Sequence, residues 1–578
     1  MHPADWTVLI VYLAATVLLG VLLGRLVKDS SDLFAAGGKS PWWLSGLSAF
    51  MTMFSANTFV VWGGIAFKHG LVAVMINLMY GVAALLAGYT VAGRWKRLGI
   101  RTPAEFVEKR FGTGALHFYT WFMMTLRVVA SAGALYAIAK LIIALTAGNE
   151  AAAAWLGTAI VVFGVIIVIY TMIGGLWAVL MTDVLQFIIL NLAVIFVIPL
   201  TLMQMGEPAE VFRNAPEGFF HLTSGPNYTW FFLAGWLAIH YFMIGAEWAF
   251  VQRYLCVPTA RDARKATYLF GVLYLVSPVL WLAPPLLWRL RSPIPAGASE
   301  TEITNLAENA YILSCQSVLP AGMIGLMLAA MFSATASLVS AQLNVFSGVL
   351  TSDIYRHFRP QAGERRLVAV GRLFTVLLGG LITGIALAIP VLGGAEKVII
   401  AVTELMVVPL LAPCLWGLVN RKVPTAALWL TVGICFPLGL AFRFLLPDGA
   451  GGLVGWLHAN DKLIETLIGV ALPLVITAVV VHTRKREAPG WGRIAALERP
   501  AGEEAPAPKP SRIPALVVGI SMGACSLMMV ALIFVNERNK GTLGAFAAVL
   551  AVIAVVMLLL ARKPAARRGG RETFPDPR

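Results

Sequence analysis

Residues 319–355, LPAGMIGLMLAAMFSATASLVSAQLNVFSGVLTSDIY, form an apolar stretch long enough to cross a lipid bilayer, which takes about 20 residues. Six small polar residues recur within it at steps of three or four: Ser333, Ser337, Ser340, Asn344, Ser347 and Thr351. On a helix this spacing places all six on one face. Such a stripe inside a membrane has two interpretations: close packing against a neighbouring helix, or a dehydrated cation site built from oxygen ligands.

The composition extends the membrane interpretation to the whole chain. Of the 578 residues, 59% are hydrophobic and 13% are charged, whereas soluble domains have about 25% charged residues. Repeated apolar runs separate short charged loops, so we predict an all-α polytopic membrane protein with about fifteen transmembrane helices. The net charge of +15 does not indicate nucleic-acid binding, because Lys and Arg gather mostly in alternate loops. We expect the lipid bilayer as partner, with no nucleic acid and no obligate protein partner.

The charge distribution also predicts an orientation. The first cations, Arg25 and Lys28, follow the first span, and the predicted number of spans is odd. We therefore expect a multi-pass protein of the plasma membrane with its N-terminus outside and its C-terminus in the cytoplasm. Residues 483–512 are expected to form a Pro- and Ala-rich cytoplasmic linker, 513–561 a C-terminal helical hairpin, and 562–578 a basic cytoplasmic tail.

Two of the predicted spans contain polar interruptions. The second span, near residues 43–68, has hydroxyl, amide and glycine residues at its middle, and the seventh, near 229–252, contains Glu247 with Tyr241 nearby. Small-residue packing is one interpretation of the second span. Interrupted spans in corresponding positions instead predict a central binding site at the junction of two inverted repeats.

Several motifs occur together in one order along the chain. They are Ser30–Trp43 (SSDLFAAGGKSPWW), Arg97–Gly112 (RLGIRTPAEFVEKRFG), Tyr170–Gln186 (YTMIGGLWAVLMTDVLQ), Gln252–Leu255 (QRYL), Leu319-Pro320 and Thr351–Tyr355 (TSDIY). On these motifs the chain resembles the sodium:solute symporter family from about residue 5 to 450. The resemblance implies a LeuT-type fold of five plus five inverted-repeat helices with extra flanking helices, alternating access, and solute uptake driven by sodium.

The same resemblance implies a division of the chain. An N-terminal flanking helix occupies 1–40, the first inverted repeat 41–204, the second 228–419, and further flanking helices 420–482, ahead of the linker, hairpin and tail. An enzyme is not expected, because the hydrolase-like motif Gly519–Gly523 lies within an apolar span rather than a strand-turn-helix elbow.

The resemblance further implies where sodium, the expected coupling ion, binds. The family's main site falls on the carbonyls of Met51, Phe54 and Ala334 and on the hydroxyl of Ser337. The family's second hydroxyl falls on Leu338, which has no side-chain oxygen, so water or a neighbour such as Ser333 or Ser340 would have to complete the shell. A second family site falls on Asp183 and Ser340.

The solute is expected between the second and seventh spans, near Asn57, Thr58, Glu247, Tyr241 and Trp248. Three roles are open for Glu247: pairing with a basic substrate, binding a proton, or forming a salt bridge with a cation such as Arg127. Glu404 is a second possible proton site.

Sodium-coupled symport of a small organic solute by alternating access is thus the leading hypothesis. Proton-coupled transport on the same fold, and a solute sensor that does not transport, are the alternatives. The residues do not identify the solute.

Overall fold

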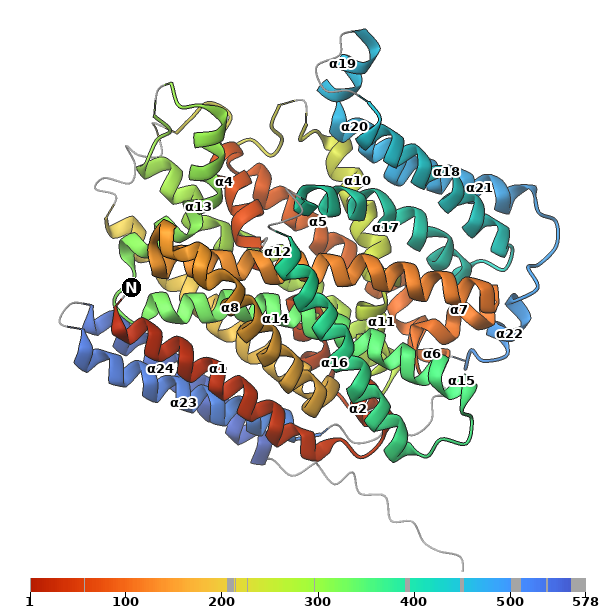
Figure 1. The fold of residues 1–578 in the computed structure, drawn as a ribbon, viewed down its shortest axis with the longest axis horizontal. Helices are drawn as coiled ribbons and strands as arrows, with labels where there is room; N and C mark the ends of the chain where they lie inside the picture. The colour runs from red at the N-terminus through yellow and green to blue at the C-terminus, as the bar shows by residue number, and fades with distance from the viewer. Residues whose placement is uncertain are drawn as a thin grey trace, which may run out of the picture. The chain divides into compact units, whose positions relative to one another are not determined.

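A computed structural model of the chain describes residues 2–562 except 57, 205–212, 214, 226, 296, 390–394, 447–451, 501–510 and 537–538. The described residues are helices and connecting loops, with one isolated β-bridge between Ser224 and Tyr228 (Figure 1). The chain forms two compact units, residues 1–510 and 511–578.

The helices of the first half of the chain begin with a long apolar helix and then become shorter and interrupted. They are α1 (Pro3–Leu23), η1 (Gly24–Leu26), α2 (Ser30–Ala35), η2 (Ala36–Gly38), α3 (Trp42–Thr52), η3 (Thr58–Trp62), α4 (Gly63–His69), α5 (Val72–Ala87), η4 (Gly88–Ala92), α6 (Gly93–Arg97), α7 (Pro103–Phe111), α8 (Thr113–Met203), α10 (Trp230–Ala246), α11 (Trp248–Leu255) and α12 (Ala260–Arg291).

The remaining helices complete the first unit and form the second. The first unit continues with α13 (Glu300–Val318), α14 (Met323–Val349), η5 (Leu350–Tyr355), α15 (Arg356–Phe358), α16 (Glu364–Ala388), α17 (Ala395–Val419), α18 (Thr425–Phe444), α19 (Gly452–Ala459), α20 (Asp461–Thr466), η6 (Leu467–Ala471), α21 (Leu472–Thr483) and α22 (Trp491–Ala495). The second unit contains α23 (Ile513–Val535) and α24 (Lys540–Arg562), which pack against each other.

The prediction of an all-α polytopic membrane protein is confirmed. Eleven of the described helices are long and apolar enough to cross a membrane, and the bent pair α10–α11 makes a twelfth. The count of fifteen was approximate for three reasons. Three predicted spans lie within α8, and the last two form one candidate membrane helix, Trp155–Met203, which turns at Gly175 (φ +55°). The span at 43–68 is divided into short helices, and α17 contributes only a shorter apolar helix.

Both interruptions predicted from polar residues are present in the structure. α3 ends at Thr52 and the π-helix η3 begins only at Thr58. The backbone N–H of Ser55 donates to the Thr58 hydroxyl at 3.3 Å, an alternative to the helical hydrogen bond that short polar side chains commonly offer. α10 and α11 meet at Glu247, whose backbone is extended, and their axes differ by 50°.

The helix that contains the polar stripe, α14, is the most buried of the candidate spans. Figure 1 shows it beside α1, α8 and α16. The side chain of Asp5, at the start of α1, accepts hydrogen bonds from the backbone N–H groups of Gly322 (2.7 Å) and Gly325 (3.1 Å). A carboxylate is favourable at a helix N-terminus, and glycine at 325 allows the two helices this close approach. The start of α14 is thus anchored to the start of α1.

We predict that Gly325→Ala destabilises the protein, because a Cβ at this position would lie 2.0 Å from the Asp5 carbonyl oxygen. Overpacking of this kind costs about 1–3 kcal/mol. The matched control is Gly384→Ala on α16, where a Cβ would meet no atom within 4 Å; this change should stabilise the helix by about 1 kcal/mol. Thermal unfolding of both purified variants measures the difference, and equal melting temperatures would contradict the anchoring role.

Candidate functional site

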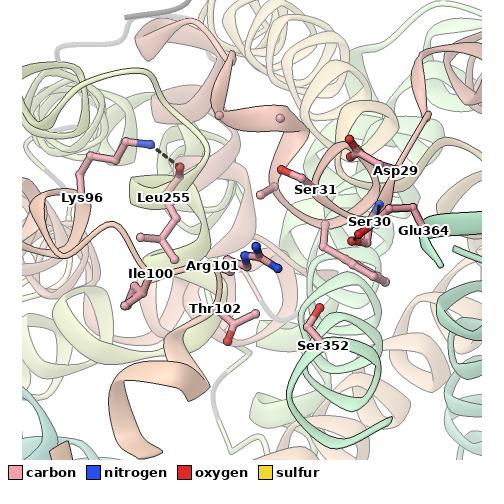
Figure 2. Close-up of a pocket in the computed structure, with 14 residues that line it drawn as sticks. Asp29, Ser30, Ser31, Lys96, Ile100, Arg101, Thr102, Leu255, Ser352 and Glu364 are labelled. Carbon is pink, nitrogen blue, oxygen red and sulfur yellow. Dashed lines mark hydrogen bonds between the residues drawn. The ribbon is translucent and has the colours of Figure 1, made fainter. Parts of the chain in front are cut away.

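A polar cavity of about 430 Å³ lies where α2, the loop before α7, the end of α11, η5 and the start of α16 come together (Figure 2). Two contacts join these segments across the sequence. The Ser30 hydroxyl donates to the Glu364 carboxylate at 2.7 Å, and Lys96 Nζ donates to the Leu255 carbonyl at 2.9 Å. Beside the cavity, the Thr102 hydroxyl donates to Asp353 at 2.8 Å.

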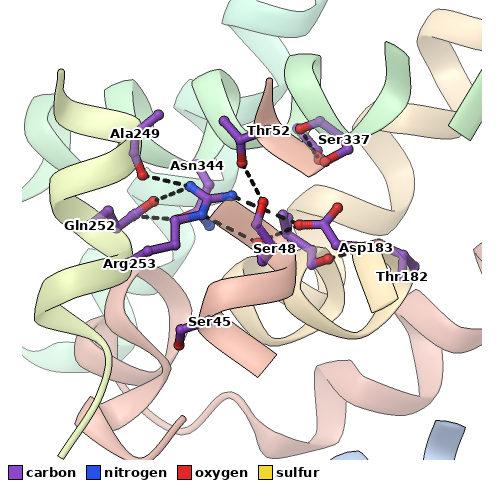
Figure 3. Close-up of polar contacts among 12 residues, drawn as sticks. Ser45, Ser48, Thr52, Thr182, Asp183, Ala249, Gln252, Arg253, Ser337 and Asn344 are labelled. Carbon is purple, nitrogen blue, oxygen red and sulfur yellow. Dashed lines mark hydrogen bonds and ion pairs between the residues drawn. The ribbon is translucent and has the colours of Figure 1, made fainter. Parts of the chain in front are cut away.

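A buried ionic cluster lies deeper, between α3, α8 and α11 (Figure 3). The Ser48 hydroxyl donates to Asp183 Oδ2, and the Arg253 Nε–H donates to the Ser48 hydroxyl at 3.3 Å. Arg253 Nη2 lies 4.0 Å from Asp183 Oδ2, and both side chains are at most 1% exposed. Burying either charge alone would be very costly, so the two charges stabilise each other.

The cluster is not fully satisfied by the protein. Three buried polar atoms in and beside the cluster have no hydrogen-bond partner in the described structure: Asp183 Oδ1, Arg253 Nη2 and the Ser337 hydroxyl. Both ends of the Gln186 amide, three residues after Asp183 on α8, are also without a partner there. The Ser337 hydroxyl lies near the Asp183 carboxylate (Figure 3). Buried polar groups nearly always have partners, so these atoms make the region a candidate ligand site.

The break in α3 lies against α14 beside this cluster. The Ala56 N–H donates to the Thr335 hydroxyl at 2.9 Å, which attaches the break to the middle of α14. The residues expected to bind sodium are all fully buried here: Met51, Phe54, Ala334, Ser337, Asp183 and Ser340. The structure therefore places the interrupted backbone, the serines of α14 and the aspartate of α8 in one region.

The polar stripe on α14 has more than one role. At one end, Ser333 and the Tyr12 hydroxyl of α1 are hydrogen-bonded. Further along, Asn344 accepts a hydrogen bond from Gln252 (2.7 Å) and donates to the Leu33 carbonyl (3.1 Å). These contacts fit the helix-packing interpretation, and they commit Ser333 to α1 rather than to an ion. Ser337 is the member of the stripe whose hydroxyl has no partner in the described structure.

Glu247, at the bend between α10 and α11, has two partners from other helices. Its Oε2 lies 3.0 Å from Arg127 Nη2 on α8, and its Oε1 accepts a hydrogen bond of 3.1 Å from the Gln342 amide on α14. Of the three roles left open for Glu247, the salt bridge with Arg127 is the one that the structure contains.

The other residues expected at the solute site differ in burial, and not all of them lie in the described part of the chain. Thr58 is buried at the start of η3, and Trp248 is buried with its ring centroid 5.8 Å from that of Phe346. The Tyr241 hydroxyl is hydrogen-bonded to Thr90 at 3.0 Å in an exposed contact. Asn57 lies outside the described residues, as does the side chain of Glu404.

Three residues of the cluster escaped the sequence analysis. Arg253 entered the sequence analysis only as part of the QRYL motif, and the structure places it in α11 at full burial. Its position in the QRYL motif was the available signal. Thr335 lies outside the three-and-four spacing of the stripe. Gln186 closes the Tyr170–Gln186 motif, and only its unpaired amide indicates a role.

Comparisons with known proteins agree on one family. A model described as the sodium:solute symporter family matches residues 33–429. The chain is 27% identical over 472 residues to the sodium/glucose cotransporter of Vibrio parahaemolyticus, covering 76% of this chain and 85% of that protein. It is 26% identical over 397 residues to the sodium/sialic acid symporter NanT of Aliivibrio fischeri, covering 65% and 74%.

A solved structure shows the same fold. It is a substrate-bound outward-open state of a Na⁺-coupled sialic acid symporter, which matches with a TM-score of 0.71 at 21% identity and covers 84% of this chain and 98% of that one.

We predict that Glu247→Gln destabilises the protein by about 3–5 kcal/mol, because the Arg127 guanidinium would remain buried without its carboxylate. Arg127→Met combined with Glu247→Gln should recover most of that loss. Glu487→Gln is the control, since its pair with Arg421 at 3.1 Å is exposed and should contribute less than about 1 kcal/mol. Melting temperatures of these three variants and of Arg127→Met alone provide the test, and strictly additive effects of Arg127→Met and Glu247→Gln would refute the pairing.

Proposed function

Since the chain belongs to the sodium:solute symporter family, and is therefore a multi-pass sodium-coupled symporter with a LeuT-type fold, we propose that its sodium site lies between the break in α3 and the middle of α14. The observation that supports this placement is the group of unpaired buried oxygens, Asp183 Oδ1 and the Ser337 hydroxyl, beside the interrupted backbone.

The chemistry of this region suits a sodium ion. Hard cations bind carboxylate, carbonyl and hydroxyl oxygens, and the broken helix supplies backbone carbonyls that are not committed to a regular helix. We assign the ligands to the carbonyls of Met51, Phe54 and Ala334 and to the Ser337 hydroxyl. Asp183, the one carboxylate of the group, with Ser340, forms a second possible position. Leu338 supplies no oxygen, so Asp183 becomes the natural source of a further ligand.

The solute is proposed to bind between η3 and the α10–α11 bend, near Asn57, Thr58, Glu247 and Trp248, with Tyr241 toward the rim. Arg127 neutralises Glu247, so this position offers a balanced pair of charges rather than an anionic pocket. The relatives named above include transporters of glucose and of sialic acid, so sugars are the first class to examine. Ion and solute are coupled because each stabilises the same state of the transporter.

The direct test is thermal unfolding of the purified protein with a panel of small solutes, in sodium and in potassium, at two pH values. A ligand that binds only the folded state raises the melting temperature. We expect one solute class to stabilise the protein only when sodium is present. Stabilisation that follows pH and ignores sodium would favour the proton-coupled alternative, and solute binding without uptake into vesicles would favour a sensor.

Ser337→Ala should weaken sodium binding, because it removes one oxygen from the group around the Asp183 carboxylate. We expect the sodium concentration for half-maximal stabilisation to rise about tenfold, which corresponds to about 1.4 kcal/mol. Ser347→Ala is the matched control on the same helix, since the Ser347 hydroxyl donates to the Leu343 carbonyl of its own helix at 2.5 Å. An unchanged sodium dependence in Ser337→Ala would sink the assignment.

The polar cavity of Figure 2 is proposed as the cytoplasmic exit, consistent with an outward N-terminus and a cytoplasmic C-terminus. Its cross-links, Ser30 to Glu364 and Lys96 to Leu255, join segments that alternating access would have to separate. In inside-out vesicles we expect a cysteine introduced as Ser352→Cys to react faster with an impermeant thiol reagent when sodium and solute are both present. A rate that ignores both ligands would contradict the exit assignment.

A further inference from the structure

Residues 487–499, which follow α21 and contain the short helix α22, fold back onto the first unit beside α7 (Figure 1). The side chains of Ala488 and Ile494 are buried there, at 3% and 0% exposure. The segment lies beyond residue 429, where the match to the family model ends. It contains none of the residues assigned above to sodium, to the solute or to the exit, so its contacts need a separate explanation.

The last residues of this segment hold the end of α6. Glu498 is shared by two guanidinium groups, with its Oε2 2.8 Å from Arg94 Nη2 and its Oε1 3.1 Å from Arg97 Nη2. The backbone N–H of Arg499 donates to the Arg97 carbonyl at 3.1 Å. The Trp491 ring lies 5.4 Å from the guanidinium carbon of Arg94. A network of charges positions a segment more firmly than an isolated surface pair does.

The middle of the segment binds the end of α7. Arg493 Nε donates to the Lys109 carbonyl at 2.8 Å. The guanidinium carbon of Arg110 lies 5.7 Å from the Trp491 ring, a cation–π contact. Gly490 lies so close to the Arg110 backbone that a Cβ at this position would be 1.9 Å from the Arg110 carbonyl oxygen. Glycine is therefore required at 490 for the segment to reach α7.

The beginning of the segment binds the turn between α17 and α18. The Ala488 N–H donates to the Arg421 carbonyl at 2.9 Å, and Arg421 Nη1 lies 3.1 Å from Glu487 Oε1. The same turn is joined to α7, because Arg110 Nε donates to the Gly417 carbonyl at 2.9 Å. One short segment thus connects α6, α7 and the α17–α18 turn.

The connected helices belong to different parts of the fold. α6 ends the span Val72–Arg97, which packs against α10 and α12, whereas α7 leads into α8, which packs against α14 and α16. The corner between α6 and α7 supplies Ile100, Arg101 and Thr102 to the wall of the cavity of Figure 2. The segment therefore holds both ends of a corner that has to move if that cavity is to open.

We propose that residues 487–499 are a releasable strap that restrains the opening of the cavity of Figure 2. This inference rests on the proposed cytoplasmic exit and adds a control element outside the sodium and solute sites. The strap is suited to release because only Ala488, Gly490 and Ile494 within it are buried, and the side chain of Glu498 remains 21% exposed. Segments with few buried apolar contacts open locally while the rest of a protein stays folded.

The test uses the full chain in lipid nanodiscs, without sodium or solute, carrying Ser352→Cys; the chain without that change gives the background reaction of the native thiols. Gly490→Ala should lift the strap from Arg110, and Gly492→Ala is the matched control, because a Cβ there would meet no atom within 4 Å. We expect Gly490→Ala to speed amide hydrogen exchange of residues 488–499 at least tenfold. The cysteine introduced at 352 should then react with a thiol reagent about three times faster.

Two results would overturn the proposal. Faster amide exchange with an unchanged cysteine rate would show that the segment restrains nothing, and equal exchange in Gly490→Ala and Gly492→Ala would show that Gly490 does not hold it. If Gly490→Ala does not fold, Glu498→Gln replaces it, with Glu465→Gln as control, since Glu465 pairs with Lys462 inside α20. A failure of the exit itself is distinguished, because it appears as a Ser352→Cys rate that ignores sodium and solute while the strap is intact.

Discussion

A helix that stops inside a membrane exposes backbone groups that lipid cannot satisfy, and the protein must satisfy them instead. In this protein α3 stops at Thr52 and η3 resumes the chain at Thr58. The neighbouring helix α14 satisfies one of these groups, since its Thr335 hydroxyl accepts a hydrogen bond from the backbone N–H of Ala56. The dense burial of α14, its small residues and its anchoring by Asp5 all follow from the need to bring this helix close to the break.

Two ion pairs hold the second broken helix in place around its own interruption. Arg127 and Asp183 belong to α8, and their partners Glu247 and Arg253 lie at the bend and within α11. Arg127 lies in the span Thr113–Ile143 and Asp183 in the span Trp155–Met203, so the bent helix is paired with two different spans. It could not shift far along either one without separating buried charges. Such pairs contribute little net stability, but breaking one leaves a buried charge without compensation. The bend is therefore positioned by charge, and the break in α3 by neutral hydrogen bonds.

The sequence predicted the membrane class and the helix interruptions, but not the contacts between distant residues. Periodicity and composition were sufficient for the membrane class, and polar residues inside apolar spans were sufficient for both interruptions, because a bilayer imposes strict limits on where such residues occur. Contacts between residues far apart in the sequence could not be predicted from local patterns. Nothing local at Asp5 indicates the start of α14, and the distribution of Lys and Arg along the chain does not indicate that Arg253 is buried. Ser333 and Ser337 were equivalent in spacing, and only the neighbouring helices distinguish them.

The self-neutralising pairs also determine how the membrane potential acts on the protein. With Asp183 beside Arg253 and Glu247 beside Arg127, the charges of these four described groups sum to zero. A sodium ion added there would give the loaded centre one positive charge. An electric field does work of about 2.3 kcal/mol per 100 mV on a charge that crosses all of it. Voltage would therefore accelerate the inward movement of the loaded transporter and leave the return of the empty one electrically silent.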